Sequence, residues 1–230
     1  MRVKLVCCTD TGQVREHNED YIAGDESLGL AVLADGMGGY QAGEVASEMA
    51  VKIIIKQLHA PLKKMHRVKH RANYRYHSAT VLLEQAVLTA NKVIYHLAEQ
   101  ETHYQGMGTT VVAVLFHNNF MSIAHVGDSR LYRLRGHKFR QITKDHSVNQ
   151  ELIDCGIYTQ EQARHSPSKH LVTRALGVHK KVNVEIQEES LNSQDTYLLC
   201  SDGLSDMLTD SEMQAILNKA DTLEQAAQVL

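Results

Sequence analysis

Three apolar segments of the chain each end in an aspartate beside a glycine; the aspartates are Asp35, Asp128 and Asp202. One Asp-Gly pair after a strand is usually only a turn. Three carboxylates at one end of a sheet would repel each other, and burying them is costly unless a cation lies among them. Oxygen ligands select hard divalent cations such as Mg²⁺ or Mn²⁺. Two such cations about 3.5 to 4 Å apart would acidify a shared water.

The glycines after Asp35 fit this interpretation. Because Gly36, Gly38 and Gly39 carry no side chains, the backbone can bend sharply and offer a carbonyl oxygen to a cation at close range. The spacing excludes other glycine motifs: the third glycine of G-x-G-x-x-G is missing, and the chain has neither a G-x-x-x-x-G-K-[ST] loop nor a G-x-S-x-G elbow.

Upstream of Asp35, a guanidinium and two more carboxylates precede the strand expected at 21–23; they belong to Arg15, Glu19 and Asp20. The fixed fork of arginine donors is a natural partner for a phosphate dianion. Taken alone, this stretch is typical of a surface loop of mixed charge. Beside the three aspartates, it indicates a phosphate site.

Composition limits the class of protein. With 230 residues, 43% of them hydrophobic and 22% charged, the chain is expected to form one soluble domain over residues 1–230. The net charge of −3 gives no general attraction to nucleic acid or to anionic membranes. The basic run at 62–77 is therefore interpreted as a solvated connection, with a nucleic-acid patch as the less favoured alternative.

The cysteines and histidines suggest no metal finger. Four cysteines without a Cys-x-x-Cys pair, and no N-terminal apolar signal, predict reduced thiols in a cytoplasmic protein. None of the 14 histidines has the spacing of a zinc motif. No run approaches the roughly 20 apolar residues of a membrane span.

The elements that must position the aspartates alternate between short β-branched runs and long helical ones. Two helices are predicted, at 42–58 and 80–101, the second with an apolar stripe from Leu83 to Leu97. A capping box starts a later helix at Thr209. Short turns at 117–119 and 135–137 predict antiparallel hairpins. The pattern favours an α+β fold. Strands are expected at 3–9, 21–23, 28–34, 109–116, 120–126, 131–134, 182–186 and 196–200.

Seven motifs in order resemble the metal-dependent protein phosphatases of the PP2C or PPM family, in their bacterial form. Each is weak alone, but the series covers nearly the whole chain. They are Arg15 with Asn18-Glu19-Asp20, Asp35-Gly36-Met37-Gly38-Gly39, Gly108-Thr109-Thr110, Gly127-Asp128-Ser129-Arg130, Thr143-Lys144-Asp145-His146-Ser147, Leu171 through Gly177, and Ser201-Asp202-Gly203-Leu204.

This resemblance implies a four-layer α-β-β-α sandwich of two antiparallel sheets flanked by helices. It also implies two Mn²⁺ or Mg²⁺ ions and a third, weaker site. By motif, Asp35 would bridge two metals, the Gly36 carbonyl would bind one and Asp202 the other, while Asp128 and Asp206 would hold the third. The implied reaction is in-line attack of a metal-bridging hydroxide on phosphoserine or phosphothreonine.

Further roles are implied for residues near the metals. Arg15 matches the phosphate-binding arginine and, with Asp20, is expected to be catalytic. Glu19 and Asp20 match groups that hold metal-bound water. Residues 147–170 match a flap that helps to select substrates. The expected partners are phosphorylated proteins, the substrates of a cognate kinase, and the expected state is a monomer.

Two departures from the family pattern stand out. Met37 occupies a position where many eukaryotic relatives have a histidine suspected as general acid, so we name no acid. The family's closing Asp-Asn motif and last strand are absent before Leu230, which predicts a truncated chain or a metal site with one ligand fewer.

Two other functions stay open at this stage. A regulatory module could keep the fold and bind phosphoproteins without turnover, although the intact aspartates argue against it. The hydrolase could also act on a small phosphorylated metabolite, because the metal-binding residues do not select the substrate.

Overall fold

The computed structural model describes residues 3–39, 42–65 and 76–230. Most of the basic run at 62–77 lies outside the described residues, so its interpretation stays a prediction. Within the described part, no helix is long and apolar enough to cross a membrane.

The larger sheet forms the centre of the molecule, with the order β1-β2-β4-β5-β8 and β3 beside β2. All its neighbouring strands pair antiparallel. The hairpin predicted at 117–119 joins β4 to β5, with Asn118 at φ 50°. The strands are β1 Asp20–Asp25, β2 Leu30–Met37, β3 Gly108–Thr109, β4 Val111–His117, β5 Phe120–Val126 and β8 Glu185–Ser190.

The smaller sheet has the order β7-β6-β9, also antiparallel. Its strands are β6 Arg130–Arg135, β7 Lys138–Gln141 and β9 Thr196–Cys200. The predicted turn at 135–137 joins β6 to β7. Because β6 follows β5 after a short connection, the chain crosses directly from one sheet to the other at Gly127, Asp128 and Ser129.

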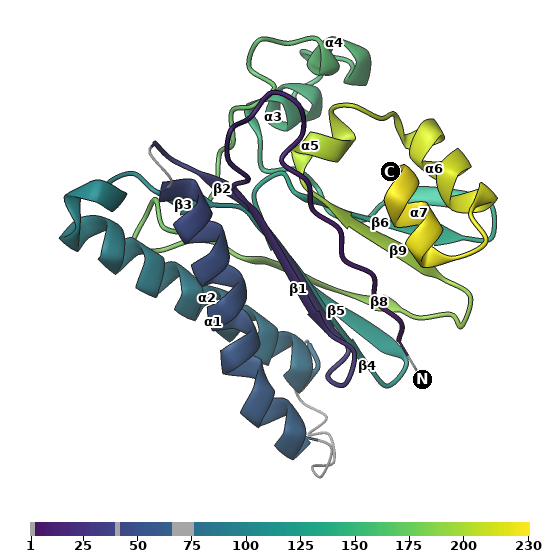
Figure 1. Cartoon of the computed structure of the whole chain (residues 1–230), viewed down its shortest axis with the longest axis horizontal. Helices are drawn as coiled ribbons and strands as arrows, with labels where there is room; N and C mark the ends of the chain where they lie inside the picture. The colour runs from purple at the N-terminus through teal and green to yellow at the C-terminus, as the bar shows by residue number, and fades with distance from the viewer. Residues whose placement is uncertain (1–2, 40–41, 66–75) are drawn as a thin grey trace.

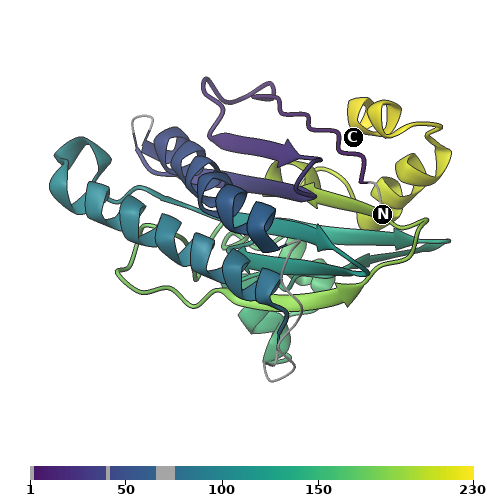
Figure 2. The same ribbon diagram turned by 90° about the horizontal axis from the view of Figure 1, so that it is seen from below.

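Two long helices, α1 Ala42–Met65 and α2 Ser78–Gln100, cover one face of the larger sheet (Figures 1 and 2). The predicted stripe of α2 is buried at Leu83, Val87 and Ile94. These side chains belong to the largest apolar cluster, which also contains Val111 and Val126 of the sheet. The α1 helix continues beyond its predicted end and includes Pro61.

The remaining layers complete the predicted sandwich. A second apolar cluster, including Val112, Ile123 and Leu131, lies between the two sheets. A third, formed around Tyr132 and Met213, joins the smaller sheet to α6 Asp210–Lys219. Figure 1 shows α6 and α7 Leu223–Val229 on the opposite side of the sheets from α1 and α2. The α-β-β-α prediction is confirmed.

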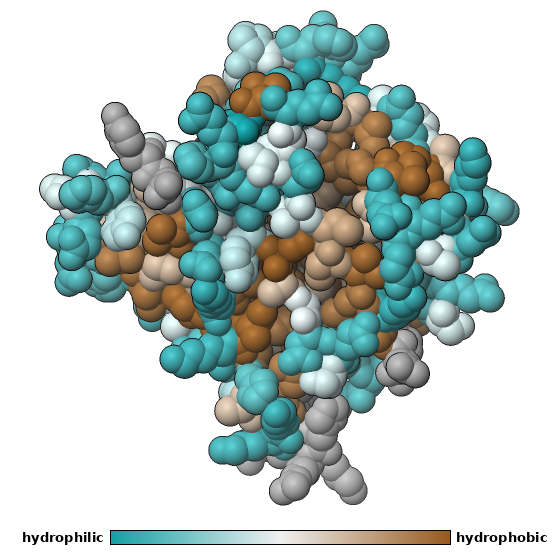
Figure 3. All heavy atoms as spheres, viewed as in Figure 1, coloured by the Kyte–Doolittle hydropathy of each residue, from teal (hydrophilic) through white to brown (hydrophobic). Residues whose placement is uncertain are grey.

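A cavity of about 220 Å³ with a mixed polar and apolar lining opens between the N-terminal segment and both sheets. Its lining includes Val3, Leu5, Val114, Tyr197 and Leu199, but none of the predicted metal-binding residues. Figure 3 shows apolar side chains exposed on the face where the N-terminal segment runs, between more hydrophilic helices.

Several elements differ from the sequence predictions. Residues 3–9 form no strand, although they follow the sheet in an extended course (Figure 1). The predicted strand 182–186 lies later, at β8, and β7 was not predicted. The capping box at Thr209 is confirmed at the start of α6, where Thr209 Oγ1 accepts from the Glu212 amide.

The 147–170 segment is more ordered than its polar composition suggests. It contains the short helices α3 Val148–Asp154 and α4 Gln160–Arg164. Asn149 is buried and donates to the Ala163 carbonyl, which joins the two helices. Its base is closed by pairing between Ser147 and Val172.

Candidate metal centre

Asp20 and Asp35 lie directly opposite each other at one end of the β1–β2 pair. Their carboxyl groups lie close enough for the charge of Asp20 to raise the pKa of Asp35, and Ser201 Oγ donates to Asp20 Oδ2 at 2.6 Å. Two buried carboxylates so close together disfavour full ionisation of the pair, so without a cation one of them holds a proton. The three elements β1, β2 and the end of β9 therefore meet at one acidic site.

The electrostatics of Asp35 show which other groups surround it. Burial, followed by the nearby charges of Asp20, Asp202 and Asp128 in that order of importance, raises the pKa of Asp35 to about 9. Burial, together with repulsion from Asp202 and Asp145, raises the pKa of Asp128 to about 7. Four carboxylates from separate parts of the chain thus converge.

This convergence fits divalent cations. Burial raises the pKa of Asp20 as well, so the fold disfavours full ionisation of the group. A hard divalent cation would compensate the crowded charge that otherwise requires protons. Asp35, Asp128 and Asp202 are the residues that would hold it, as their sequence pattern predicts.

Asp35 is held in place through its own peptide groups. Its N–H donates to Thr110 Oγ1 at 3.1 Å, and its carbonyl accepts from the Thr110 N–H at 2.8 Å. Thr110 Oγ1 also lies 2.6 Å from Ser129 Oγ, beside Asp128. Thr110 therefore links the backbone at Asp35, near the end of β2, with Ser129, the neighbour of Asp128 after β5.

Gly36 is buried at the end of β2, against the start of α1. Its N–H donates to the Glu19 carbonyl at 3.0 Å. A Cβ at this position would collide with the Gly43 carbonyl. The close approach of Gly43 explains why a glycine follows Asp35. Gly36 lies next to Asp35, at the edge of the acidic site.

Asp202 and Asp206 lie one turn apart on α5 Asp202–Ser205 and its C-cap. The end of the 147–170 segment approaches both: Lys169 Nζ lies 2.8 Å from Asp206 Oδ2, and His170 Nδ1 lies 3.7 Å from Asp202 Oδ2. The ligand atoms of His170, Asp202 and Asp206 form a group with the spacing of a metal site. The predicted residue Asp206 therefore adjoins the centre through Asp202.

Arg15 lies on the loop before β1, and its side chain is 78% exposed. Its Nη1 is 3.7 Å from Glu19 Oε2. This position leaves the guanidinium free to meet a ligand from solvent. The side chains of the predicted residues Arg15 and Glu19 thus lie near each other. The Glu19 carbonyl, which accepts from the Gly36 N–H, connects them with the acidic site.

Sequence reasoning missed the supporting residues around Asp128. Arg130 holds Asp145 through Nε and Nη2, with the Nη2–Oδ2 distance at 2.7 Å. Both lie in quoted motifs, but their 15-residue separation gave no sign that they pair. Ser201 was overlooked for the same reason.

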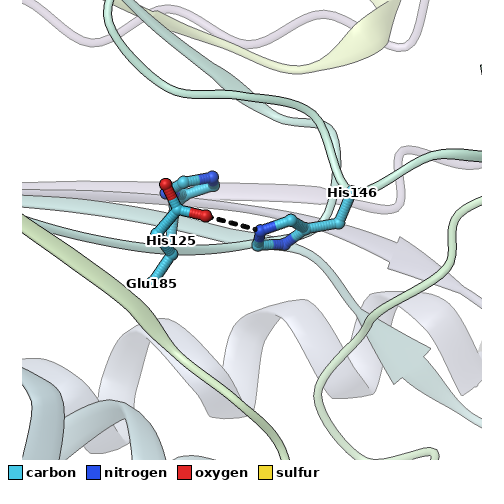
Figure 4. Close-up of side chains that lie close together, drawn as sticks. All are labelled: His125, His146 and Glu185. Carbon is cyan, nitrogen blue, oxygen red and sulfur yellow. Dashed lines mark hydrogen bonds and ion pairs between the residues drawn. The ribbon is translucent and has the colours of Figure 1, made fainter. Parts of the chain in front are cut away.

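A second cluster contains His125, His146 and Glu185 (Figure 4). The two imidazole rings stack with centroids 4.7 Å apart, and His146 Nε2 lies 3.2 Å from Glu185 Oε2. No zinc-type spacing predicted this group, because β5, β8 and the loop after β7 contribute one residue each.

Comparison with known proteins agrees with this geometry. Residues 9–229 match the family Protein phosphatase 2C. The serine/threonine phosphatase stp of Listeria monocytogenes is 39% identical over 224 residues, covering 96% of this chain and 85% of the relative. An α-β-β-α fold with acidic groups at one end of its sheets defines the class, and the chain belongs to the protein phosphatase 2C family.

Solved structures give the same result. Serine/threonine phosphatase Stp1 from Staphylococcus aureus superposes with a TM-score of 0.82 at 34% identity, covering 96% of this chain and 85% of that one. The catalytic domain of the phosphatase PstP, solved in complex with two manganese ions, gives 0.80 at 35% identity, with 96% and 86% covered.

Proposed function

We propose that this protein is a metal-dependent serine/threonine phosphatase that hydrolyses phosphoserine and phosphothreonine in proteins. The observation that carries the proposal is the meeting of Asp20, Asp35, Asp128 and Asp202, where burial and the neighbouring charges raise the pKa of Asp35 to about 9. The 2C family match and the manganese-bound relative support it. Mn²⁺ or Mg²⁺ is the cofactor.

The residues have distinct proposed tasks. Asp35, Asp202, Asp128, Asp206 and the carbonyl of Gly36 would hold the cations. When bound, two divalent cations supply Lewis acidity and an activated water for in-line displacement at phosphorus. The chain's own part is to fix the carboxylates: the Asp35 N–H donates to Thr110 Oγ1, which holds the backbone of Asp35, and Ser201 Oγ donates to the carboxylate of Asp20.

Arg15 and Asp20 are proposed to act on the reactants, with Glu19 in support. The exposed Arg15 fork can bind the phosphate dianion from the solvent side. Glu19 lies between this arginine and the backbone of Gly36, and can orient both. Met37, at the end of β2, has no proton to donate, so it cannot protonate the leaving oxygen.

The substrates and setting are part of the same proposal. We take residues 1–230 as one phosphatase domain and residues 147–170 as its substrate-selecting flap. The partners are phosphorylated proteins, the products of a cognate serine/threonine kinase. The protein would act as a monomer in the cytoplasm, without nucleic acid or membrane.

Turnover of a phosphothreonine peptide tests the function. We expect hydrolysis that requires Mn²⁺ and stops with a chelator, and no turnover in Asp35→Asn, which keeps the size of the side chain. Arg135→Lys, remote from the centre, is the matched control. Phosphopeptide binding without metal-dependent turnover would favour a binding module, and faster hydrolysis of small phosphate esters would favour a metabolite substrate.

A further inference from the structure

The turn between β5 and Asp128 is tightly confined at Gly127. Its φ is +105°, and a Cβ there would lie 2.6 Å from Thr110 Cβ. On the other side, the Gly127 N–H donates to His146 Nδ1 at 3.1 Å, and the Gly127 carbonyl accepts from the His146 N–H at 2.9 Å. One buried histidine thus binds both peptide groups of the residue that precedes Asp128.

These bonds fix the tautomer of His146. Because the Gly127 N–H can only donate, Nδ1 must be the acceptor, and the neutral ring carries its proton on Nε2. That proton points to Glu185 Oε2, which lies 3.2 Å from His146 Nε2 (Figure 4). Burial lowers the pKa of His146, which is consistent with the neutral ring.

The tautomer argues against a metal in this second cluster. Arg174 Nη1 lies 3.2 Å from His146 Nε2 and can only donate, so this contact is not a hydrogen bond when Nε2 carries the proton; the Gly127 N–H, whose direction the backbone fixes, decides for Nδ1 as the acceptor. A cation at Nε2 would displace the proton and meet the positive charge of Arg174. His125 Nε2 lies 2.9 Å from the Lys144 carbonyl, so it carries the proton of that ring. Its Nδ1 has no partner within the described part of the chain. With the proton of His146 on Nε2, only the lone pair of His125 Nδ1 and the Glu185 carboxylate of the cluster are left, which is fewer protein ligands than a bound metal normally has.

His146 also forms the base of the flap. Its carbonyl accepts from the Thr173 N–H at 2.8 Å, next to the pairing of Ser147 with Val172. His125 stacks on the buried ring and prevents it from turning. The same residue therefore contacts both the metal-binding turn and the segment that carries the flap.

From this geometry we propose that His146 is a positioning residue, whose Nδ1 holds Gly127 so that the Asp128 carboxylate faces the cations. The inference rests on the proposed function for the role of Asp128. Removing an outer hydrogen bond of this kind typically weakens metal affinity about 10- to 100-fold. The loss should fall on the site that uses Asp128.

Two variants of similar size separate the Nδ1 bond from packing. In His146→Asn the amide oxygen takes roughly the place of Nδ1 and can accept from Gly127. In His146→Gln the amide lies near the place of Nε2, and the acceptor is lost. Each variant is measured for exchange of the Gly127 amide hydrogen in the metal-free protein, and for Mn²⁺ affinity by calorimetry.

We expect His146→Gln to exchange the Gly127 amide faster and to bind Mn²⁺ about tenfold more weakly, with the KM for phosphopeptide little changed. His146→Asn should approach wild type in both measurements. Equal losses in the two variants, or wild-type Mn²⁺ affinity in His146→Gln, would overturn the proposal. A wild-type protein that binds no Mn²⁺ would instead contradict the proposed function.

If neither variant folds, the NMR chemical shifts of the imidazole nitrogens in the wild-type protein still test the proposal. We expect Nδ1 of His146 to be unprotonated and Nε2 protonated in the metal-free protein. A protonated Nδ1 would exclude the bond from Gly127, and with it the proposal.

Discussion

Asp20 and Asp35 face each other across β1 and β2, where burial and the charge of Asp20 raise the pKa of Asp35 to about 9. Asp35 therefore holds a proton at neutral pH in the folded protein, although both groups are ionised in an unfolded chain at that pH. The fold therefore stores a proton where the cations bind. Cation and proton must compete for Asp35, because a carboxylate ligand has to be deprotonated.

The first prediction is that metal binding releases protons. At pH 7, below the pKa of about 9 for Asp35, Mn²⁺ or Mg²⁺ should displace about one proton or more for each protein molecule. Calorimetric titration in two buffers of different ionisation enthalpy measures that number. With Mg²⁺ the release should be smaller at pH 9. A binding enthalpy independent of buffer at pH 7 would show that the metal-free protein holds no proton on Asp35 for the cation to displace.

The second prediction concerns the metal-free protein. An unfolded aspartate loses its proton near pH 3.8, but folded Asp35 keeps it up to about pH 9. Its stabilising contribution is thus complete below pH 3.8 and is lost as the pH rises towards 9. In chelator at pH 8, Asp35→Asn should be more stable than wild type, by on the order of a few kcal/mol.

Urea denaturation of both proteins at pH 5 and pH 8 measures this difference. Asp154→Asn is the control, because Lys144 lowers the pKa of this exposed carboxylate. The control should gain no stability at pH 8. A less stable Asp35→Asn protein at pH 8 would show that the carboxylate is not under strain without metal.

Local patterns predicted the strands that carry the aspartates well. In β2, β4, β5 and β9 the apolar and β-branched residues are continuous, because these strands are packed in or near the interior. The acidic convergence followed from where these strands end. Residues 3–9 have the same local pattern but pair with no strand among the described residues, since pairing depends on a neighbour and not on composition.

The rest depended on contacts that local sequence does not contain. The β8 strand reads EIQEES, and its pairing with β5 fixes its position although half its residues are charged. Arg130 and Asp145, like Gly127 and His146, come together only when the loop after β7 returns to the end of β5. Tertiary structure selects such pairs, so spacing alone could not assign them.

A third prediction concerns the pairing of Arg130 with Asp145, whose side chain is only 9% exposed. In Arg130→Lys one ammonium replaces a two-pronged contact, so stability should fall by about 1–3 kcal/mol. Asp145 raises the pKa of Asp128, and weaker neutralisation of Asp145 should also reduce Mn²⁺ affinity. Urea denaturation and calorimetry measure the two effects.

Arg135→Lys provides the comparison for this variant. Arg135 holds Asp195 with the same two-pronged geometry, at a distance of 2.7 Å for each contact, but away from the metal centre. This variant should lose stability while keeping wild-type Mn²⁺ affinity. Equal Mn²⁺ affinities in Arg130→Lys and Arg135→Lys would show that Arg130 does not influence metal binding.

The last prediction concerns Lys169, near the end of the 147–170 segment, whose Nζ lies 2.8 Å from Asp206 Oδ2. The ammonium occupies a carboxylate that a cation would use, so Lys169→Met should strengthen binding at the weakest Mn²⁺ site. The ion pair is partly exposed, with 37% and 30% of the side chains accessible, so the gain should be about two- to fivefold.

Lys144→Met tests whether loss of positive charge alone explains such a gain. Lys144 pairs with Asp154 at 2.6 Å on the surface, and its removal should leave the weakest site within about twofold of wild type. Calorimetric Mn²⁺ titrations of the three proteins at matched ionic strength measure the difference. Weaker binding in Lys169→Met would show that the lysine supports the cation site instead of competing for it, because removing a competitor can only strengthen the binding of the cation.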